Sequence, residues 1–146
     1  MKQRVTCLLL CIILLCGCTG KDIALTAALS DLLPAEADQI VLTNCHNGVR
    51  TWITVPEDIA AIRAFLEGIT GQDPESGKGY YEGSYSITFC QNRETVFSMA
   101  FGDSDCFYAG EYGDGYPIRY LLKETTIADD VIPFFSQFDT SSLQSN

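Results

Sequence analysis

From residue 39 onward, hydrophobic and polar residues alternate with the period of two that a half-buried β-strand shows. The first alternating stretch is interrupted by Asn47-Gly48, a dipeptide that favours a two-residue type I′ hairpin turn. Such a loop pairs His46 with Val49, and the register that follows places four aliphatic side chains on one face. These residues form two cross-strand pairs, Leu42 with Ile53 and Ile40 with Val55, while Arg50 and Trp52 fall on the opposite face. The sequence therefore predicts a β-hairpin over residues 39–55.

A helical pattern follows the hairpin directly. Pro56 suits the first position of a helix, and Glu57 and Asp58 place negative charge at the positive end of the helix dipole. Hydrophobic residues then recur at helical spacing until glycines end the pattern. The hydrophobic positions are Ile59, Ile62, Phe65, Leu66 and Ile69, and the glycines are Gly68 and Gly71. We predict one amphipathic helix that starts at residue 56, followed by a polar, flexible loop at residues 71–79.

The second half of the chain has the pattern of four further strands. Two alternating stretches flank a turn at 92–94, and their hydrophobic residues pair across it as Tyr85 with Phe101, Ile87 with Met99 and Phe89 with Phe97. All six side chains then lie on one face, which supports this register. Turns at 103–105 and 113–115 delimit two more strands, at 106–112 and 116–123.

A short helix is predicted near the C-terminus. Thr126 and Asp129 have the spacing of a capping box, and Pro133 must either begin the helix or kink it. Phe134, Phe135 and Phe138 supply its apolar face. Residues 140–146 are polar and are interpreted as a frayed tail.

Together these elements predict the order β-β-α-β-β-β-β-α in a single small α+β domain at residues 39–139. Its antiparallel sheet is expected to have about six strands, with one or two helices packed on one face. Residues 18–38 are interpreted as a tether. A short helix is an alternative within it, because Leu25, Leu29 and Leu32 recur at helical spacing before Pro34.

The first twenty residues have the pattern of a signal sequence. Lys2 and Arg4 form a positively charged start, and a mainly hydrophobic run of twelve residues follows at 5–16. A membrane-spanning helix needs about 20 apolar residues, so this run is too short to cross a bilayer. Its length is that of the hydrophobic region of a signal peptide.

The residues that close this run, Leu15-Cys16-Gly17-Cys18, resemble the lipobox of bacterial lipoproteins. Leu15 and Gly17 match the pattern, whereas Cys16 stands where alanine or serine is commoner. The resemblance implies that residues 1–17 are a lipoprotein signal peptide and that Cys18 receives a diacylglyceryl group. It also implies that acylated Cys18 anchors the protein in the cell membrane, facing outside the cytoplasm, because two or three acyl chains give stable attachment.

The negative charge of the chain limits the classes of molecule that it can bind. Nine basic and nineteen acidic residues give a formal net charge of −10, and removal of residues 1–17, with two basic and no acidic residues, changes it to −12. Nucleic acid is excluded as a partner, because phosphate binding requires a clustered basic surface. An anionic bilayer mildly repels such a domain, so the domain is expected to stand off the membrane.

The seven cysteines do not predict a disulfide framework, because three lie in the signal peptide and one is acylated. Cys45, Cys90 and Cys106 remain. With Cys90 opposite Val96, a bridge between Cys90 and Cys106 is excluded, since the two residues lie about 20 Å apart along the shared strand. Two alternatives stay open: a bridge that involves Cys45, or three buried free thiols.

The sequence carries no recognisable catalytic motif. His46 is the only histidine, which excludes a multi-histidine metal site, and its place beside the predicted turn indicates an exposed hairpin tip. Nucleophile-elbow, dinucleotide-binding and phosphate-binding motifs do not occur. Acidic pairs such as Asp129-Asp130 are explained as helix-start residues. We therefore assign no catalytic residue, no metal and no cofactor.

One cluster of residues does suggest a function. All seven tyrosines lie between residues 80 and 120, with acidic residues interleaved. Aromatic rings with polar tips and an acidic rim suit recognition of a protein, a glycan or a cationic ligand. The candidate binding surface comprises Tyr108, Tyr112, Tyr116, Asp103, Asp105 and Asp114. The alternatives are that the tyrosines belong to the core, or that the aspartates bind calcium, although their spacing is not that of an EF-hand loop.

The sequence thus predicts a membrane-anchored extracytoplasmic lipoprotein with a small, non-catalytic binding domain. Its expected partners are the lipid bilayer, through acylated Cys18, and a protein or glycan. The competing hypothesis is an envelope-associated enzyme or a structural accessory protein. A pocket that holds converging carboxylates or His46 would favour catalysis, and a flat exposed aromatic patch would favour binding.

Overall fold

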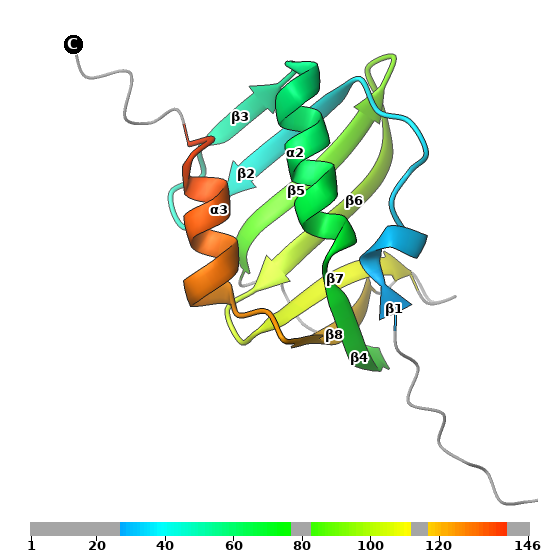
Figure 1. The fold of residues 1–146 in the computed structure, drawn as a ribbon, viewed down its shortest axis with the longest axis vertical. Coiled ribbons are helices and arrows are strands. Elements are labelled where there is room, and N and C mark those ends of the chain that lie inside the picture. The colour runs from blue at the N-terminus through cyan, green and yellow to red at the C-terminus, as the bar shows by residue number, and fades with distance from the viewer. Residues whose placement is uncertain (1–26, 77–82, 112–116, 140–146) are drawn as a thin grey trace, which may run out of the picture.

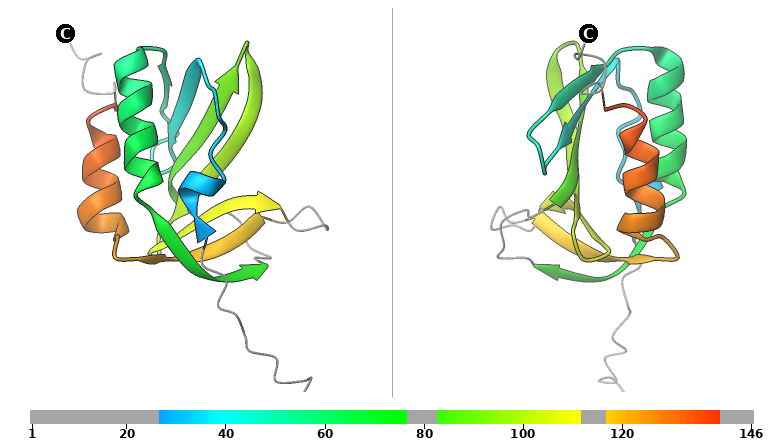
Figure 2. Two further views of the ribbon diagram at one scale, coloured as in Figure 1. Left: turned by 45° about the vertical axis from the view of Figure 1, so that its right-hand side comes forward. Right: turned by 90° about the vertical axis from the view of Figure 1, so that its left-hand side faces the viewer.

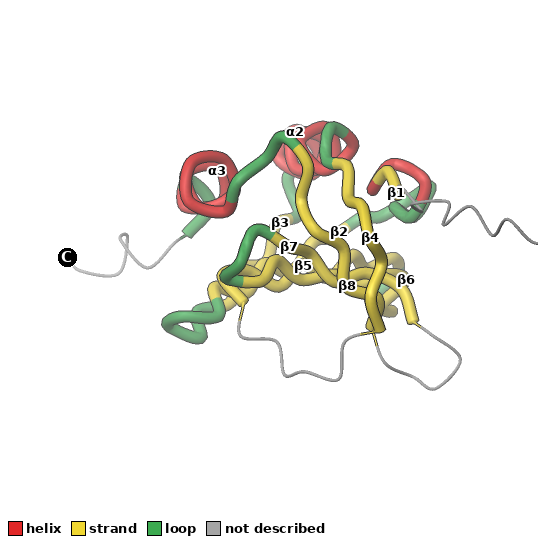
Figure 3. Tube along the Cα trace, turned by 90° about the horizontal axis from the view of Figure 1, so that it is seen from below, coloured by secondary structure: helices red, strands yellow, loops and turns green. Residues whose placement is uncertain are grey.

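The computed structural model describes residues 27–76, 83–111 and 117–139, which form one antiparallel sheet with helices on one side (Figure 3). This is the α+β fold that the hydrophobic pattern predicts. The strands are β1 (Ala27–Ala28), β2 (Gln39–Asn44), β3 (Arg50–Ile53), β4 (Thr70–Ser76), β5 (Gly83–Gln91), β6 (Glu94–Gly102), β7 (Cys106–Glu111) and β8 (Pro117–Lys123). The helices are η1 (Leu29–Asp31), α2 (Pro56–Glu67), η2 (Ile127–Val131) and α3 (Ile132–Ser136). Within these ranges the sheet has eight strands, two more than expected, because β1 and β4 join it.

The strands are ordered β1-β4-β8-β7-β6-β5-β2-β3 across the sheet. Each neighbouring pair is antiparallel, and β5 to β8 form a meander through its middle. The two short strands β1 and β3 therefore occupy opposite edges (Figure 1). Helices α2 and α3 lie on the same side of the sheet (Figure 2).

The hairpin of β5 and β6 has the predicted register, with Tyr85 opposite Phe101, Ile87 opposite Met99 and Phe89 opposite Phe97. Asn92 and Arg93 have φ values of 53° and 70°, the left-handed geometry that tight hairpin turns require. One detail differs from the prediction. A bulge at Val96 pairs Cys90 with Thr95, so Val96 is not the partner of Cys90.

The loop between β2 and β3 is longer than predicted. The N–H of Gly48 donates to the carbonyl of Asn44 at 2.8 Å and closes a four-residue loop at 45–48. Of the Asn47-Gly48 pair only Gly48 has a positive φ, 73°, so the predicted type I′ turn is wrong. The side-chain oxygen of Asn47 instead accepts the N–H of Val49 at 2.9 Å, which stabilises the wider turn.

The longer loop changes the partners in this hairpin but not the faces. Ile40 lies opposite Ile53, and Leu42 lies opposite Thr51. Because side chains alternate with a period of two, a shift of two residues keeps each one on its predicted face. Val55, the predicted partner of Ile40, is instead the half-exposed N-cap residue of α2.

Strand β4 forms where a polar loop was predicted at 71–79. A Cβ at Gly71 would lie 2.5 Å from the ring of Phe107 and 2.6 Å from Tyr120 Cβ, so glycine lets the strand pass close to this stacked pair. The pairing with β8 is irregular around Pro74, which has no N–H to donate. The loop prediction is wrong for residues 71–76, which pair with β8 as part of β4, and at Gly71 this strand packs closely on the aromatic pair.

The folded domain also begins earlier than the predicted residue 39. Strand β1 pairs with β4, and Leu29 is fully buried, with its N–H donating to the carbonyl of Ile69 at 3.0 Å. Arg63 on α2 donates to the carbonyl oxygens of Pro34 and Ala35. The interpretation of 18–38 as a tether is therefore wrong for residues 27–38. The short helix considered there is present as the single 3-10 turn η1.

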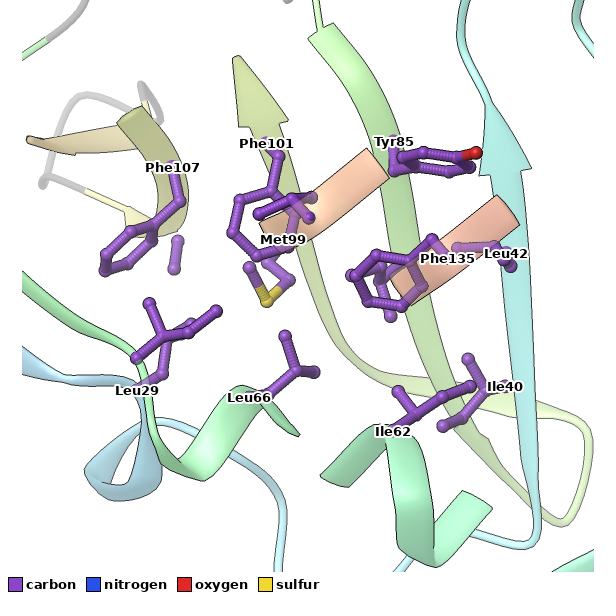
Figure 4. Packing of buried hydrophobic residues seen from close by; sticks show 14 of the residues in the cluster. Leu29, Ile40, Leu42, Ile62, Leu66, Tyr85, Met99, Phe101, Phe107 and Phe135 are labelled. Atoms are coloured by element: carbon purple, nitrogen blue, oxygen red, sulfur yellow. The ribbon is translucent and has the colours of Figure 1, made fainter. Parts of the chain in front are cut away.

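The core fills the space between the helices and the sheet, and Phe135 lies at its centre (Figure 4). Its ring centroid is 5.4 Å from that of Tyr85, 6.0 Å from that of Phe101 and 5.5 Å from that of Phe65. Fully or almost fully buried aliphatic side chains complete the layer around it: Leu29, Ile40, Leu42, Ile62, Leu66 and Ile87. The apolar stripe of α2 is thus buried as predicted.

Thr126 caps the C-terminal helix as the sequence predicts, but the carboxylate that accepts its N–H belongs to Asp130 and not to the predicted Asp129. Thr126 Oγ1 accepts the N–H of Asp129 at 3.2 Å, and the N–H of Thr126 donates to Asp130 Oδ2 at 2.8 Å. The first turn, η2, is wide, and Pro133 then stands in the first turn of α3. Pro133 therefore begins the regular helix. Among the residues that the structure describes, no helix has the length and apolar character needed to cross a membrane.

Candidate functional site

The side of the sheet opposite the described helices is the candidate functional surface (Figure 2). Side chains of paired residues point to the same face, so they line up in a row across the strands. The row runs Arg50 (β3), Thr43 (β2), Ser86 (β5), Ala100 (β6), Tyr108 (β7) and Arg119 (β8). We call this row, together with the adjacent pair Thr88 and Ser98, the open face.

Short side chains leave a shallow pocket in the middle of the open face. The pocket has a volume of about 220 Å³ and is lined by Cys45, Ser86, Ser98, Met99 and Ala100. The hydroxyl of Ser98 donates to the hydroxyl of Thr88 at 3.2 Å, across the strands. The described lining contains no charged side chain. A hollow of this kind suits a neutral ligand that packs on apolar atoms and exchanges a few hydrogen bonds with the serine hydroxyls.

Tyr108, one of the predicted binding residues, lies beside Ala100 on this face and is half-buried. Burial raises the pKa of its phenol, the neighbouring Cys106 raises it further, and Arg119 lowers it. The phenol is therefore neutral at physiological pH and both donates and accepts hydrogen bonds. Gly102 provides room for the ring, since a Cβ there would lie 3.1 Å from it and 2.5 Å from Cys106 Sγ.

The two described aspartates of the predicted surface differ in role. Asp103 is exposed, and its Oδ1 lies 3.8 Å from Nε2 of His46, whose loop reaches the same end of the sheet. Asp105 Oδ1 instead accepts the N–H of Ile127 at 2.7 Å, and its carbonyl accepts the N–H of Leu122 at 2.8 Å. Asp105 therefore ties the turn at 103–105 to the start of the C-terminal helix, a structural role that the sequence pattern did not reveal.

The remaining predicted residues of the surface, Tyr112, Asp114 and Tyr116, lie outside the described residues. Two other tyrosines belong to the core, as one of the sequence alternatives proposed. Tyr85 and Tyr120 are 3% and 5% exposed, and they pack against Phe135 and Phe107 respectively. Of the described tyrosines, only Tyr108 contributes to the open face.

Cys45 lies next to the pair of His46 and Asp103, but its environment does not activate it. Desolvation raises the pKa of the thiol, a backbone hydrogen bond at Ser86 lowers it, and the negative charge of Asp103 raises it. A nucleophilic thiol requires a depressed pKa or a base that accepts its proton. The Sγ of Cys45 instead faces the carbonyl oxygen of Thr43 at 3.8 Å. This geometry does not favour thiolate catalysis.

The three described cysteines are free thiols. Cys90 and Cys106 are buried, whereas Cys45 is exposed. Of the two alternatives from the sequence, the structure has the free thiols, with the correction that Cys45 is not buried. Within the described ranges, no three acidic, cysteine or histidine side chains gather as a metal site would require.

A second hollow, which the sequence did not predict, lies at the β3 edge of the sheet. It has a volume of about 250 Å³ and is lined by Thr51, Trp52, Ile53, Thr54, Val55, Asp58, Gln137 and Phe138. The alternation of residues does place Trp52 away from the core. It cannot reveal that residues 137–138 end beside β3, because that contact depends on how the C-terminal helix crosses the sheet.

Comparison with known proteins adds no template for either hollow. No family model, curated protein or solved structure matches the chain.

Proposed function

We propose that this protein is a lipoprotein held in the cell membrane by acylated Cys18, with its domain outside the cytoplasm. The support is the lipobox-like Leu15-Cys16-Gly17-Cys18, which follows a charged start and a short hydrophobic run. Ala27 is nine residues after Cys18 in the sequence, a separation that spans at most about 32 Å when fully extended. In this proposal the tether keeps the domain close to the bilayer surface.

We further propose that the domain is a non-catalytic binding module whose open face recognises a glycan. The observation that carries this proposal is the pocket of about 220 Å³, in which Ser86 and Ser98 stand beside the apolar Met99 and Ala100 without a charged side chain in the described lining. Serine hydroxyls substitute for the water that solvates sugar hydroxyls. Tyr108 adds an apolar ring with a polar tip next to the pocket. A protein surface is the alternative partner.

Labelling with a fatty acid tests the membrane anchor. The protein isolated from cells grown with the label should carry it on Cys18, and mass spectrometry should find Cys18 as the first residue. A Cys18→Ala variant should carry no label and should leave the membrane fraction. An intact Met1 on the wild-type protein would contradict the proposed anchor.

A variant that fills the pocket tests the binding function. Ser98→Phe should weaken binding to soluble peptidoglycan glycan strands about tenfold or more, measured by calorimetry, because the ring occupies the hollow. Ser136→Phe places the same ring on the exposed surface of α3 and is the matched control. Absence of glycan binding by the wild-type protein, or equal binding by both variants, would contradict the glycan proposal.

A further inference from the structure

Strand β3 ends the sheet with one side of its backbone open. The N–H of Asn44 donates to the carbonyl of Val49 at 2.9 Å, which fixes the alternation of the antiparallel ladder. The peptide groups of Thr51 and Ile53 therefore point toward β2, and those of Arg50 and Trp52 point outward. Among the described residues no strand lies on that outer side (Figure 1). An edge of this kind is a template for another strand.

The same edge carries the most exposed large hydrophobic side chains of the described chain. Trp52 is 61% exposed, and Val55, three residues later, is 50% exposed. Proteins usually protect an open edge with a charged side chain, proline or a covering loop. On β3 the charged residue is Arg50, which starts the strand and lies outside the lining of the hollow. An exposed tryptophan has the opposite effect, because its large ring provides the apolar area on which binding sites are built.

The hollow beside β3 adds a negative charge to this apolar edge. Asp58 lines it from the first turn of α2, together with Val55 and Phe138. Asp58 is half-buried, and within the described ranges its carboxylate has neither an ion pair nor a hydrogen bond. The rest of the lining is mixed, with the polar Thr51, Thr54 and Gln137 beside apolar residues. A half-buried carboxylate in such a hollow matches a lysine or arginine side chain, whose stem is apolar and whose head is cationic.

We propose that the β3 edge binds an extended, basic segment of another protein by strand addition. The added strand exchanges hydrogen bonds with the outward peptide groups of Arg50 and Trp52. Its side chains alternate between the two faces, so an apolar residue packs on Trp52 and the next residue, lysine or arginine, enters the hollow and reaches Asp58. The segment therefore needs a basic and an apolar residue at successive positions.

The negative net charge of the chain favours a basic partner over a second copy of the same chain. With a formal net charge of −10, two copies repel each other, whereas a basic segment is attracted from a distance. β3 and β1 lie at opposite edges of the sheet, so the site is at the far edge from the point where the described chain begins. The inference depends neither on the lipid anchor nor on the open-face pocket.

The fluorescence of Trp52 reports directly on this site, because Trp52 is the only tryptophan of the chain. The purified full chain in a neutral detergent is titrated with a short peptide of alternating lysine and valine. Binding should shift the Trp52 emission to the blue and should slow hydrogen exchange at the amides of Arg50 and Trp52. A peptide of alternating glutamate and valine, and a lysine–valine peptide with N-methylated alternate amides, should produce neither change.

Two matched pairs of variants separate the proposed contacts from general effects. Asp58→Asn should weaken binding of the lysine–valine peptide about tenfold at low salt. Glu57→Gln removes a neighbouring first-turn charge outside the hollow and should leave binding unchanged. Trp52→Thr should weaken binding to a similar extent, measured by hydrogen exchange. Val96→Ser removes another exposed hydrophobic side chain, on β6, and should leave binding unchanged.

The proposal is overturned by any of three results. These are no response to the lysine–valine peptide at millimolar concentration, an equal response to the glutamate peptide, and an equal response from Asp58→Asn and Glu57→Gln. Ser98→Phe should bind the lysine–valine peptide normally, since its substitution lies in the open-face pocket. Failure of glycan binding therefore leaves this test intact, and the reverse also holds.

Discussion

The two faces of the sheet are built from the same strands but carry opposite kinds of side chains. On β5, Ile87 and Phe89 are fully buried beneath the helices, whereas Ser86 and Thr88, which alternate with them, are partly exposed on the open face. The difference shows that burial, and with it stability, is concentrated on one side of each strand. Substitutions on the two faces should therefore have separable effects on stability and on binding.

Phe135 is the position where loss of the covered face should cost most. Phe135→Ala removes a fully buried ring of α3 that contacts α2 and the sheet, and it should lower the free energy of unfolding by about 3–5 kcal/mol. Ser98→Ala on the open face should change it by less than about 0.5 kcal/mol. Chemical denaturation measures both, and similar losses would remove the distinction between the faces.

Asp105 joins the turn between β6 and β7 to the start of the C-terminal helix. Its substitution should have the next largest effect on the free energy of unfolding. Asp105→Ala loses the acceptor for the N–H of Ile127 and places alanine at a φ of 41°, so the free energy of unfolding should fall by about 1–2 kcal/mol. Asp105→Asn retains an acceptor oxygen and tolerates this φ, so it should restore most of the loss. Asp103→Ala, at an exposed position of the same turn, should have little effect on unfolding.

Ser84 is an exception to the difference between the two faces, because this serine is fully buried. Among the residues that the structure describes, its Oγ has no hydrogen-bond partner, so its burial carries a cost of desolvation that no described group offsets. Ser84→Ala should leave the free energy of unfolding unchanged or raise it by up to about 1 kcal/mol. A clear loss of stability in thermal or chemical unfolding would mean that this hydroxyl has a partner in solution.

Tyr85 gives the buried face a contribution to stability that depends on pH. Burial and the nearby negative charge of Asp139 raise its pKa above the ordinary value of 10.0, so the folded state favours the neutral phenol. This contribution to stability is complete below pH 10 and is lost as the pH rises through the raised pKa. Tyr85→Phe should show a smaller alkaline loss of stability than the wild type. An identical pH dependence would contradict the shift.

Hydrophobic alternation predicts much of the fold because the central strands have one buried and one open face. The pairing of Ile87 with Met99 follows from the pattern and a turn of fixed length. The partner of Ile40 does not, because side-chain hydrogen bonds of Asn44 and Asn47 widen the loop by two residues. A short sequence motif does not record this local competition between turn geometries.

The candidate sites are less visible in the sequence than the fold. Tyr108 could be predicted as a surface aromatic residue, and it lies on the open face. Asp105 is the same residue type as Asp103 and lies in the same turn. Its carboxylate nevertheless accepts a hydrogen bond from a backbone amide 22 residues away. The hollow with Asp58 and Phe138 joins two segments that are distant in the sequence. Patterns within a short window carry no information about such contacts.

The sequence by itself determined the α+β class, the helix after Pro56, the register of β5 with β6 and the capped C-terminal helix. These features depend on side-chain periodicity and on turn or cap residues within a few positions of one another. Only the tertiary structure decided that polar β4 joins the sheet, that Leu29 belongs to the core and that Trp52 borders an acidic hollow. These depend on which surfaces meet after folding, since apolar area is buried between segments that the chain itself keeps far apart.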